Sequence, residues 1–205
     1  MRNDLNIFVE GIADARFLKQ YIKHVFGEDI ADNRIVVLNG WDNLKTEASA
    51  SRMRSMSDNG GVNLVIVDAD KDFLMRKNEI AVWKKENNVE FELFLLPNNK
   101  DTGALEDLLE NIINPNNKPI FECWEEYEKE LVKLDIPGRT PPPLTTPAKK
   151  TKIYGYLEAL LFETKSQKKL IKEANRNYQN TQHWDLDAEY LEPLKEFFLK
   201  IYIIL

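Results

Sequence analysis

The first hundred residues alternate between short apolar runs and longer stretches of mixed polarity. The apolar runs are rich in Val, Ile, Leu and Phe and end at Gly, Asn or Pro, which is typical of buried strands. They cover residues 5–9, 35–38, 62–67 and 91–96. The stretches between them predict helices at residues 12–26, 41–56 and 72–88. Near-continuous apolar strands separated by single helices favour an α/β fold, with a parallel four-stranded sheet flanked by helices.

The second half of the chain has no strand signal after Pro97. Apolar residues recur at helical spacing and predict helices at residues 104–113, 120–134, 153–163 and 188–205. A Pro-rich segment at residues 137–147 excludes a helix interior or a central strand. We therefore expect an α/β domain at residues 1–115 and a helical C-terminal extension at residues 116–205, with the Pro-rich loop inside the extension.

Composition and charge narrow the class of protein. The 205 residues include 28 Lys and Arg and 34 Asp and Glu, for a formal charge of -6, and this balance argues against an overall basic DNA-binding protein. No apolar run is long enough for a membrane span. Cys123 is the single cysteine, so no intrachain disulfide is possible, which fits the reducing cytoplasm. We expect Cys123 to be a buried structural thiol.

Acidic residues follow three of the predicted strands. They are Glu10 and Asp14 after the first, Asp68, Asp70 and Asp72 after the third, and Asp101, Glu106 and Asp107 after the fourth. In open parallel sheets, ligands bind beyond the carboxyl ends of the strands. Clustered carboxylates repel one another, and a hard divalent cation such as Mg²⁺ or Mn²⁺ would compensate them. The competing interpretation, strongest for the last three acids, is that they complement helix dipoles and cap helices.

The acids and their strands resemble a Toprim domain, the metal-binding module of topoisomerases, bacterial primases and OLD-family nucleases. The resemblance covers residues 5–110 and depends on two elements in the order found in that family. The first is the strand ending in Glu10 and Gly11, with Asp14 following; the second is the strand that ends in Asp68-Ala69-Asp70. Residues 94–109 also resemble a Toprim-related family of bacterial proteins without an assigned activity.

The resemblance implies a role for each of these residues. Glu10 corresponds to the general acid or base, Asp68 and Asp70 to metal ligands, and Asp14 to a second acid of the nuclease branch. Asp72 extends the acidic triplet, and Gly11 permits the tight turn between strand and helix. The implied activity is Mg²⁺- or Mn²⁺-dependent phosphodiester hydrolysis or transfer on nucleic acid. The sequence has no Walker ATPase segment before the domain, and a homodimer or a partner ATPase both remain open.

A basic segment follows an acidic one in the second half of the chain. Residues 139–176 carry nine Lys or Arg and three Asp or Glu, whereas residues 101–135 carry three Lys and ten acids. Lys149, Lys150 and Lys152 are candidate phosphate-binding residues. The alternative is that the basic segment pairs with the acidic one.

Two other functions are compatible with the sequence. Asp68 and Asp70 after a strand could be the nucleophile and the acid of a haloacid-dehalogenase-type phosphatase, although that fold normally has the pair on its first strand. The chain could also be a regulatory module that binds metal or nucleic acid without turnover.

Overall fold

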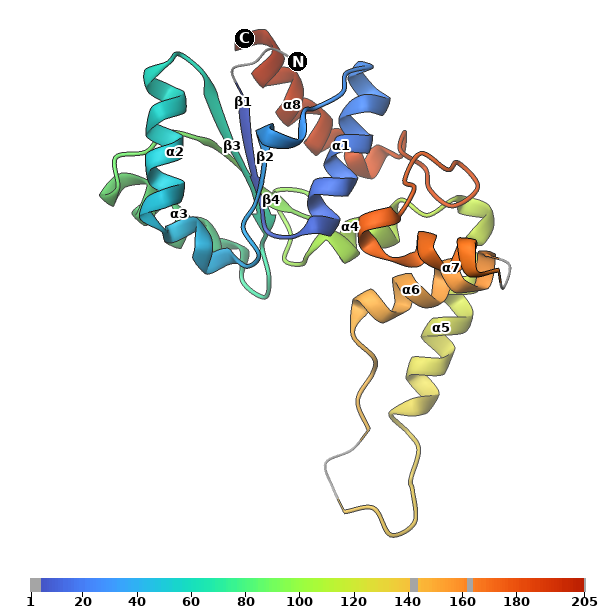
Figure 1. The fold of residues 1–205 in the computed structure, drawn as a ribbon. Helices are drawn as coiled ribbons and strands as arrows, with labels where there is room; N and C mark the ends of the chain where they lie inside the picture. The colour runs from blue at the N-terminus through green and yellow to red at the C-terminus, as the bar shows by residue number, and fades with distance from the viewer. Residues whose placement is uncertain (1–4, 141–143, 162–163, 205) are drawn as a thin grey trace.

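The fold is an α/β arrangement built on one four-stranded parallel sheet, as the sequence predicts (Figure 1). The computed structural model describes residues 5–140, 144–161 and 164–204. The strand order is β2-β1-β3-β4, and all three pairings are parallel. The strands are β1 (Leu5–Val9), β2 (Ile35–Val37), β3 (Val62–Asp68) and β4 (Glu92–Leu96).

Eight α-helices and several short 3₁₀ helices connect the described strands and complete the described part of the chain. The helices before the fourth strand are α1 (Ile12–Phe26), η2 (Trp41–Lys45, 3₁₀), α2 (Glu47–Asp58) and α3 (Phe73–Glu86). Those after it include α4 (Leu105–Asn111), α5 (Lys118–Leu131), α6 (Lys149–Leu160), α7 (Lys165–Ile171) and α8 (Glu192–Ile204).

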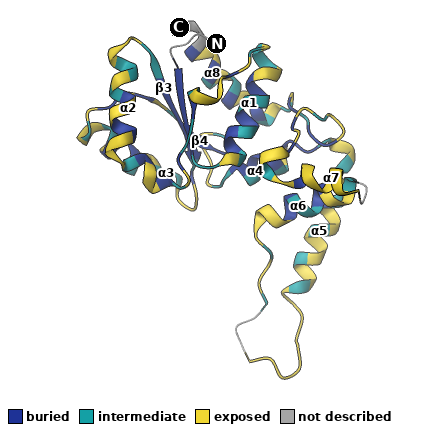
Figure 2. Ribbon diagram, viewed as in Figure 1, coloured by how far each residue is buried: buried dark blue, intermediate teal, exposed yellow. Residues whose placement is uncertain are grey.

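Helices cover both faces of the sheet, and two apolar clusters fill the space between (Figure 2). Because side chains alternate along a strand, Phe8 packs with α2 and α3, whereas Ile7 and Val9 pack with α1, α4 and α8. The two central strands, β1 and β3, are buried along most of their length. This double burial explains why the strands are apolar at nearly every position.

The C-terminal helices share the core of the sheet. Phe197 on α8 lies 5.3 Å from Phe94 on β4, and Phe198 lies 6.4 Å from Phe26 on α1, between ring centroids. The expected boundary near residue 115 therefore lies after the last strand of the sheet, but one hydrophobic core extends across it. Helix α5 and the residues after it, up to residue 140, form an arm that projects from the body, whereas α6 packs into the core beside α4 (Figure 1).

Several local predictions differ from the structure. The helix expected at residues 41–56 is a 3₁₀ turn followed by α2, because Thr46 caps α2 by accepting a hydrogen bond from the Ser49 amide. Helix α7 was not predicted. Cys123 on α5 is exposed rather than buried. Three parts of the predicted elements lie outside the described residues: 141–143 of the Pro-rich loop, 162–163, and Leu205.

Every helix in the described ranges is too short or too polar to span a lipid bilayer.

Candidate functional site

Glu10 and Asp68 come from neighbouring strands and meet at the same edge of the sheet. Val9 at the end of β1 pairs in register with Ile66 of β3, so the residues that follow lie side by side. Glu10 is half buried, and burial is the main reason that its pKa is raised, followed by the negative charge of Asp70. Arg76 and the backbone amides of Asp68 and Trp41 lower that pKa. Oε2 of Glu10 is buried and has no hydrogen-bond partner among the described residues.

Asp14 lies in the first turn of α1 and is 6% exposed. Its Oδ2 accepts a hydrogen bond of 2.7 Å from the Gly11 amide, so the side chain caps its own helix. Burial raises the pKa of Asp14 to about 7, with contributions from Glu10 and Glu106. Gly11 has an extended backbone, and its small size serves this approach: a Cβ there would lie 3.2 Å from Asp14 Oδ2.

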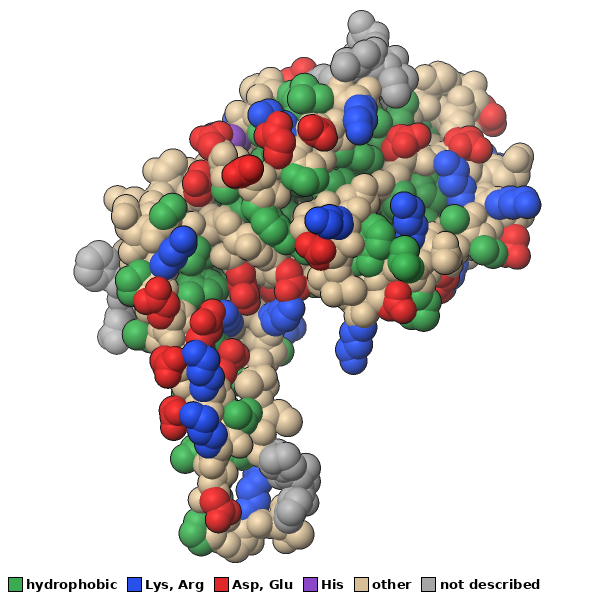
Figure 3. Space-filling model, turned by 180° about the vertical axis from the view of Figure 1, so that it is seen from behind, with side chains coloured by type: hydrophobic (Ala, Val, Ile, Leu, Met, Phe, Trp, Pro, Cys, Tyr) green, Lys and Arg blue, Asp and Glu red, His purple; other side chains and the backbone are tan. Residues whose placement is uncertain are grey.

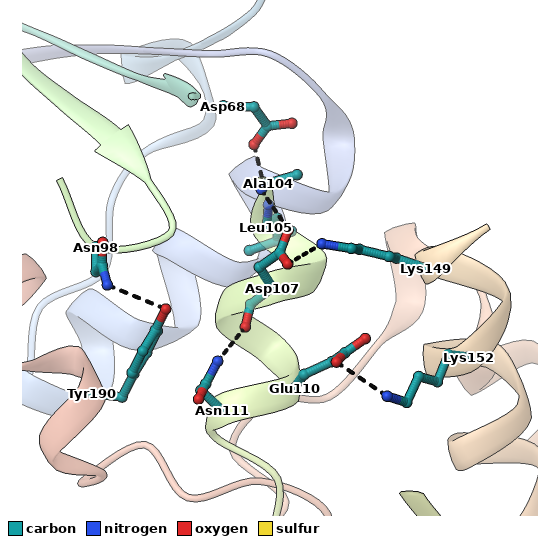
Figure 4. Close-up of polar contacts among 10 residues, drawn as sticks. All are labelled: Asp68, Asn98, Ala104, Leu105, Asp107, Glu110, Asn111, Lys149, Lys152 and Tyr190. Carbon is teal, nitrogen blue, oxygen red and sulfur yellow. Dashed lines mark hydrogen bonds and ion pairs between the residues drawn. The ribbon is translucent and has the colours of Figure 1, made fainter. Parts of the chain in front are cut away.

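Asp68 is the centre of the acidic group. Its pKa is raised to about 8, first by burial and then by the charges of Asp14, Glu10, Glu106 and Asp70. Asp68 Oδ1 accepts a hydrogen bond of 3.1 Å from the Leu105 amide at the start of α4 (Figure 4). The structure therefore brings five of the predicted acids into one electrostatically coupled group. We call this group the carboxylate rim: Glu10, Asp14, Asp68, Asp70 and Glu106.

Asp70 is exposed and lies in a constrained backbone conformation. Its φ of 55° is in the left-handed region, which few non-glycine residues adopt. Two hydrogen bonds with the Gly103 backbone, of 2.9 and 2.8 Å, hold the main chain in place. Gly103 has a φ of 137°, and a Cβ there would lie 2.6 Å from Asp107 Oδ2, so the position requires glycine.

Arg76 on α3 is the cation in contact with the carboxylate rim. Its Nη2 pairs with Asp70 Oδ2, and its Nη1 lies 3.5 Å from Glu79 Oε2. The guanidinium stacks over the ring of Trp41, with Cζ 4.5 Å from the ring centroid. Lys45 Nζ also lies over that ring, at 4.8 Å, and pairs with Glu79.

The remaining predicted acids cap helices or turns. Asp72 is exposed and caps α3 by accepting a hydrogen bond from the Met75 amide. Asp107 accepts one of 2.8 Å from the Ala104 amide and caps α4. Asp101 is exposed; its side chain accepts a hydrogen bond from Asn98 Nδ2, and its backbone amide donates one to Asn98 Oδ1. Asp72 and Asp107 therefore match the capping interpretation, Asp101 is part of a turn, and the structure does not join these three acids to the coupled group.

Two of the candidate phosphate-binding lysines are engaged with the acidic segment. Lys149 Nζ pairs with Asp107, and Lys152 Nζ lies 3.2 Å from Glu110 and 3.6 Å from Glu125 (Figure 4). Lys152 is only 8% exposed. We call this group the lysine junction: Asp107, Glu110, Glu125, Lys149 and Lys152. Acidic and basic side chains also lie close together along the projecting arm (Figure 3).

Lys150 differs from its neighbours because it is exposed, and no ion pair is found for it among the described residues. It is therefore the candidate among the three whose charge faces solvent. The other two neutralise acids of helices α4 and α5.

The rim fits a hard divalent cation by its donor chemistry. It offers carboxylate oxygens, which Mg²⁺ and Mn²⁺ prefer, and Glu10 Oε2 is a buried oxygen for which the described part of the chain provides no hydrogen-bond partner. In the described residues, however, no three acids, histidines or cysteines are already arranged to hold a metal ion. Asp70 is paired with Arg76 instead. A cation would therefore need a rearrangement of Asp70.

Sequence reasoning missed Arg76, Trp41 and Gly103. Arg76 follows Asp70 by six residues and reaches back to it only because Asp72 starts a helix between them. Trp41 is buried, and its ring also supports two cations. Gly103 is separated from Asp70 in the sequence by α3 and β4, so no local motif indicates the Asp70–Gly103 bridge.

Fold and site together define an α/β protein with a parallel sheet whose strand ends carry a coupled carboxylate group. The chain belongs to the family described as "Protein of unknown function (DUF3226)", whose model matches residues 5–203. The match spans both the sheet and the C-terminal helices. The comparisons with curated proteins and with solved structures found no match.

Proposed function

We propose that the chain is a Toprim-like enzyme that carries out divalent-metal-dependent phosphodiester hydrolysis or transfer on nucleic acid. The observation that carries this proposal is Glu10 Oε2, a buried carboxylate oxygen that has no hydrogen-bond partner among the described residues and lies next to Asp68 and Asp70. Buried polar atoms without partners are uncommon and call for an explanation. A bound ligand at the rim provides one.

The acids of the carboxylate rim divide between metal binding and proton transfer. Asp68 and Asp70 would hold Mg²⁺ or Mn²⁺, with Asp14 behind them as a buried acid that keeps the start of α1 in place. The bound metal would neutralise phosphate charge and lower the pKa of a water. Glu10 would take or give the proton, since its raised pKa brings a carboxyl group closer to neutral pH.

The exposure of Asp70 suits a polymeric substrate, because the metal-binding edge is open to a strand passing across it. We also propose that the enzyme acts in the cytoplasm, where such substrates are found; cell fractionation would test that location.

The experiment is a nuclease assay with Mg²⁺ or Mn²⁺ on single- and double-stranded DNA and RNA. We expect cleavage that EDTA stops and that Asp68→Ala abolishes, while Glu122→Gln, a change at an exposed acid of α5, leaves it intact. Undiminished cleavage by Asp68→Ala would contradict the assignment. So would calorimetry in which the wild-type protein binds no divalent cation. A phosphate trapped covalently on Asp68 would favour the phosphatase alternative.

A further inference from the structure

The guanidinium of Arg76 is held in a fixed position beside the carboxylate rim. Its side chain is 13% exposed, whereas the Asp70 side chain that it contacts is 53% exposed. Stacking on Trp41 holds the planar group from one side, and Glu79 contacts it from its own helix. Stacked arginines of this kind lose little further freedom when they bind an anion.

The Asp70 carboxylate forms an ion pair with Arg76, and the proposed metal site needs the same carboxylate as a ligand. Asp70 Oδ2 is paired with Arg76 Nη2 in the described structure. The backbone of Asp70 is tied to Gly103 by two hydrogen bonds, so a change of partner requires rotation of the side chain rather than movement of the loop. The exposure of that side chain leaves room for the rotation.

Once Asp70 turns away, the guanidinium would remain at the rim because Trp41 still supports it. Its terminal nitrogens would then present N–H donors toward the edge where the substrate phosphate lies. Arginine binds phosphate through two parallel hydrogen bonds, and its charge is not lost at any physiological pH.

We propose that Arg76 is the phosphate-binding residue of the carboxylate rim and that it exchanges partners when the site is loaded. Before loading, it neutralises Asp70; after a divalent cation takes Asp70, it binds the phosphate of the substrate. This inference rests on the proposed function and adds the group that recognises the substrate. It also predicts an order, in which the cation binds before the nucleic acid.

The first test measures cation binding by calorimetry with Mn²⁺ alone. We expect Arg76→Gln to bind Mn²⁺ about tenfold more tightly than the wild type, because the cation no longer competes with the guanidinium for Asp70. Lys45→Gln is the matched control: it removes a second charge that lies over the Trp41 ring and has no contact with Asp70, and we expect a change of less than about twofold. Equal or weaker Mn²⁺ binding by Arg76→Gln would overturn the exchange, since the arginine would then orient Asp70 as a supporting group.

The second test follows the arginine through the fluorescence of Trp41. We expect Mg²⁺ to change the Trp41 emission of the wild type, because the guanidinium stacked on the ring loses its ion pair with Asp70, and we expect this change to be absent in Trp41→Phe and in Arg76→Gln. A wild-type emission that stays constant while calorimetry shows binding would overturn the exchange and leave the metal site standing. If the wild type binds no cation at all, the proposed function itself fails.

The third test measures binding of a short oligothymidylate in Ca²⁺, which should hold the substrate without cleavage. We expect Arg76→Gln to weaken binding about tenfold or more, and Arg76→Lys to restore part of it, because lysine keeps the charge but not the paired donors. Circular dichroism identifies a variant that has not folded, in which case Arg76→Lys alone carries the test. Unchanged oligonucleotide binding by both variants would overturn the phosphate-binding role.

Discussion

Two acid-rich regions lie next to helix α4, and their charges are compensated differently. At its start, the Leu105 amide contacts Asp68 of the carboxylate rim. Along its length, Asp107 and Glu110 face α6 and pair with lysines of the junction. Five acids meet at the rim and one cation, Arg76, contacts them in the described structure. At the junction, two lysines serve three acids.

The difference appears in the pKa values. Asp68 and Asp14 have pKa values raised to about 8 and about 7, and neighbouring carboxylates contribute to both increases. Glu110 also has a raised pKa through burial, but Lys152 acts in the opposite direction. Acids that already have a cation stabilise the fold, whereas acids that repel one another retain a large capacity to bind one. Net charge alone would not separate the two regions.

The largest effect on activity should come from a change at Asp68, the centre of the carboxylate rim. We expect Asp68→Asn to reduce metal-dependent cleavage at least about a hundredfold, because the substitution removes a metal ligand of the proposed site. Initial rates at saturating Mn²⁺ measure the effect. The same change should leave the urea midpoint of the metal-free protein close to that of the wild type at pH 7, since a pKa of about 8 keeps Asp68 mostly uncharged there and the amide replaces a neutral carboxyl group. A large loss of stability with the loss of activity would show that Asp68 is structural.

At the lysine junction we expect the opposite of the rim: a substitution there should have its large effect on stability. We expect Lys152→Met to lower the free energy of unfolding by about 2–3 kcal/mol, because Glu110 and Glu125 lose their cation at a buried position. Urea denaturation measures it. Lys195→Met, which breaks an exposed pair with Glu192, should cost below about 1 kcal/mol.

A second substitution separates lost pairing from lost packing at Lys152. Adding Glu110→Gln to Lys152→Met should recover much of the loss, since the uncompensated carboxylate is then absent. If the double variant is no more stable than Lys152→Met, the lysine contributes through its contact with Phe121 instead.

The fold was largely predictable because each strand is a continuous apolar run between strong breakers. The strand ranges agree with the predicted runs to within a residue, and the Glu10–Asp68 pairing followed from the rule that parallel strand ends share one edge. The exposure of Cys123 was missed because α5 projects with the arm, and a sequence pattern does not show which helices leave the body.

The site was predictable in its acids but not in its cations. A carboxylate after a strand is placed by the strand, whereas Arg76 and Lys152 reach their partners through long side chains on helices. Pairing of the basic and acidic segments was predicted only as an alternative, since charge counts do not show which lysines are buried. The capping roles of Asp72 and Asp107 were likewise visible only as the alternative to a metal role.

A smaller effect concerns the pH dependence of stability in the metal-free protein. Asp14 faces Glu10, Glu106 and Asp68, and its folded pKa of about 7 exceeds that of an unfolded Asp. The folded state therefore binds a proton that the unfolded state releases between about pH 4 and 7. This stabilisation is complete below about pH 4 and is lost as the pH rises through 7, by at most about 1.4 kcal/mol per pH unit.

Asp14→Asn should flatten that slope by up to one proton, because the amide keeps an acceptor for the Gly11 amide without titrating. Urea midpoints at pH 5, 6 and 7 in EDTA measure the slope. Mg²⁺ should restore stability at pH 7 in the wild type, since it binds the folded state. The same slope in variant and wild type would show that Asp14 does not titrate in this range.

The smallest effect tests whether the lysines of the junction also serve the substrate. We expect Lys150→Gln to weaken oligothymidylate binding severalfold and to lower the salt slope by about 1, because its exposed charge is available to a phosphate. Lys149→Gln should weaken binding less, since the charge of Lys149 is already paired with Asp107. Fluorescence anisotropy at two salt concentrations in Ca²⁺ measures both variants. If Lys149→Gln weakens binding as much as Lys150→Gln, the pairing with Asp107 gives way to nucleic acid, and the junction then belongs to the substrate surface as well as to the fold.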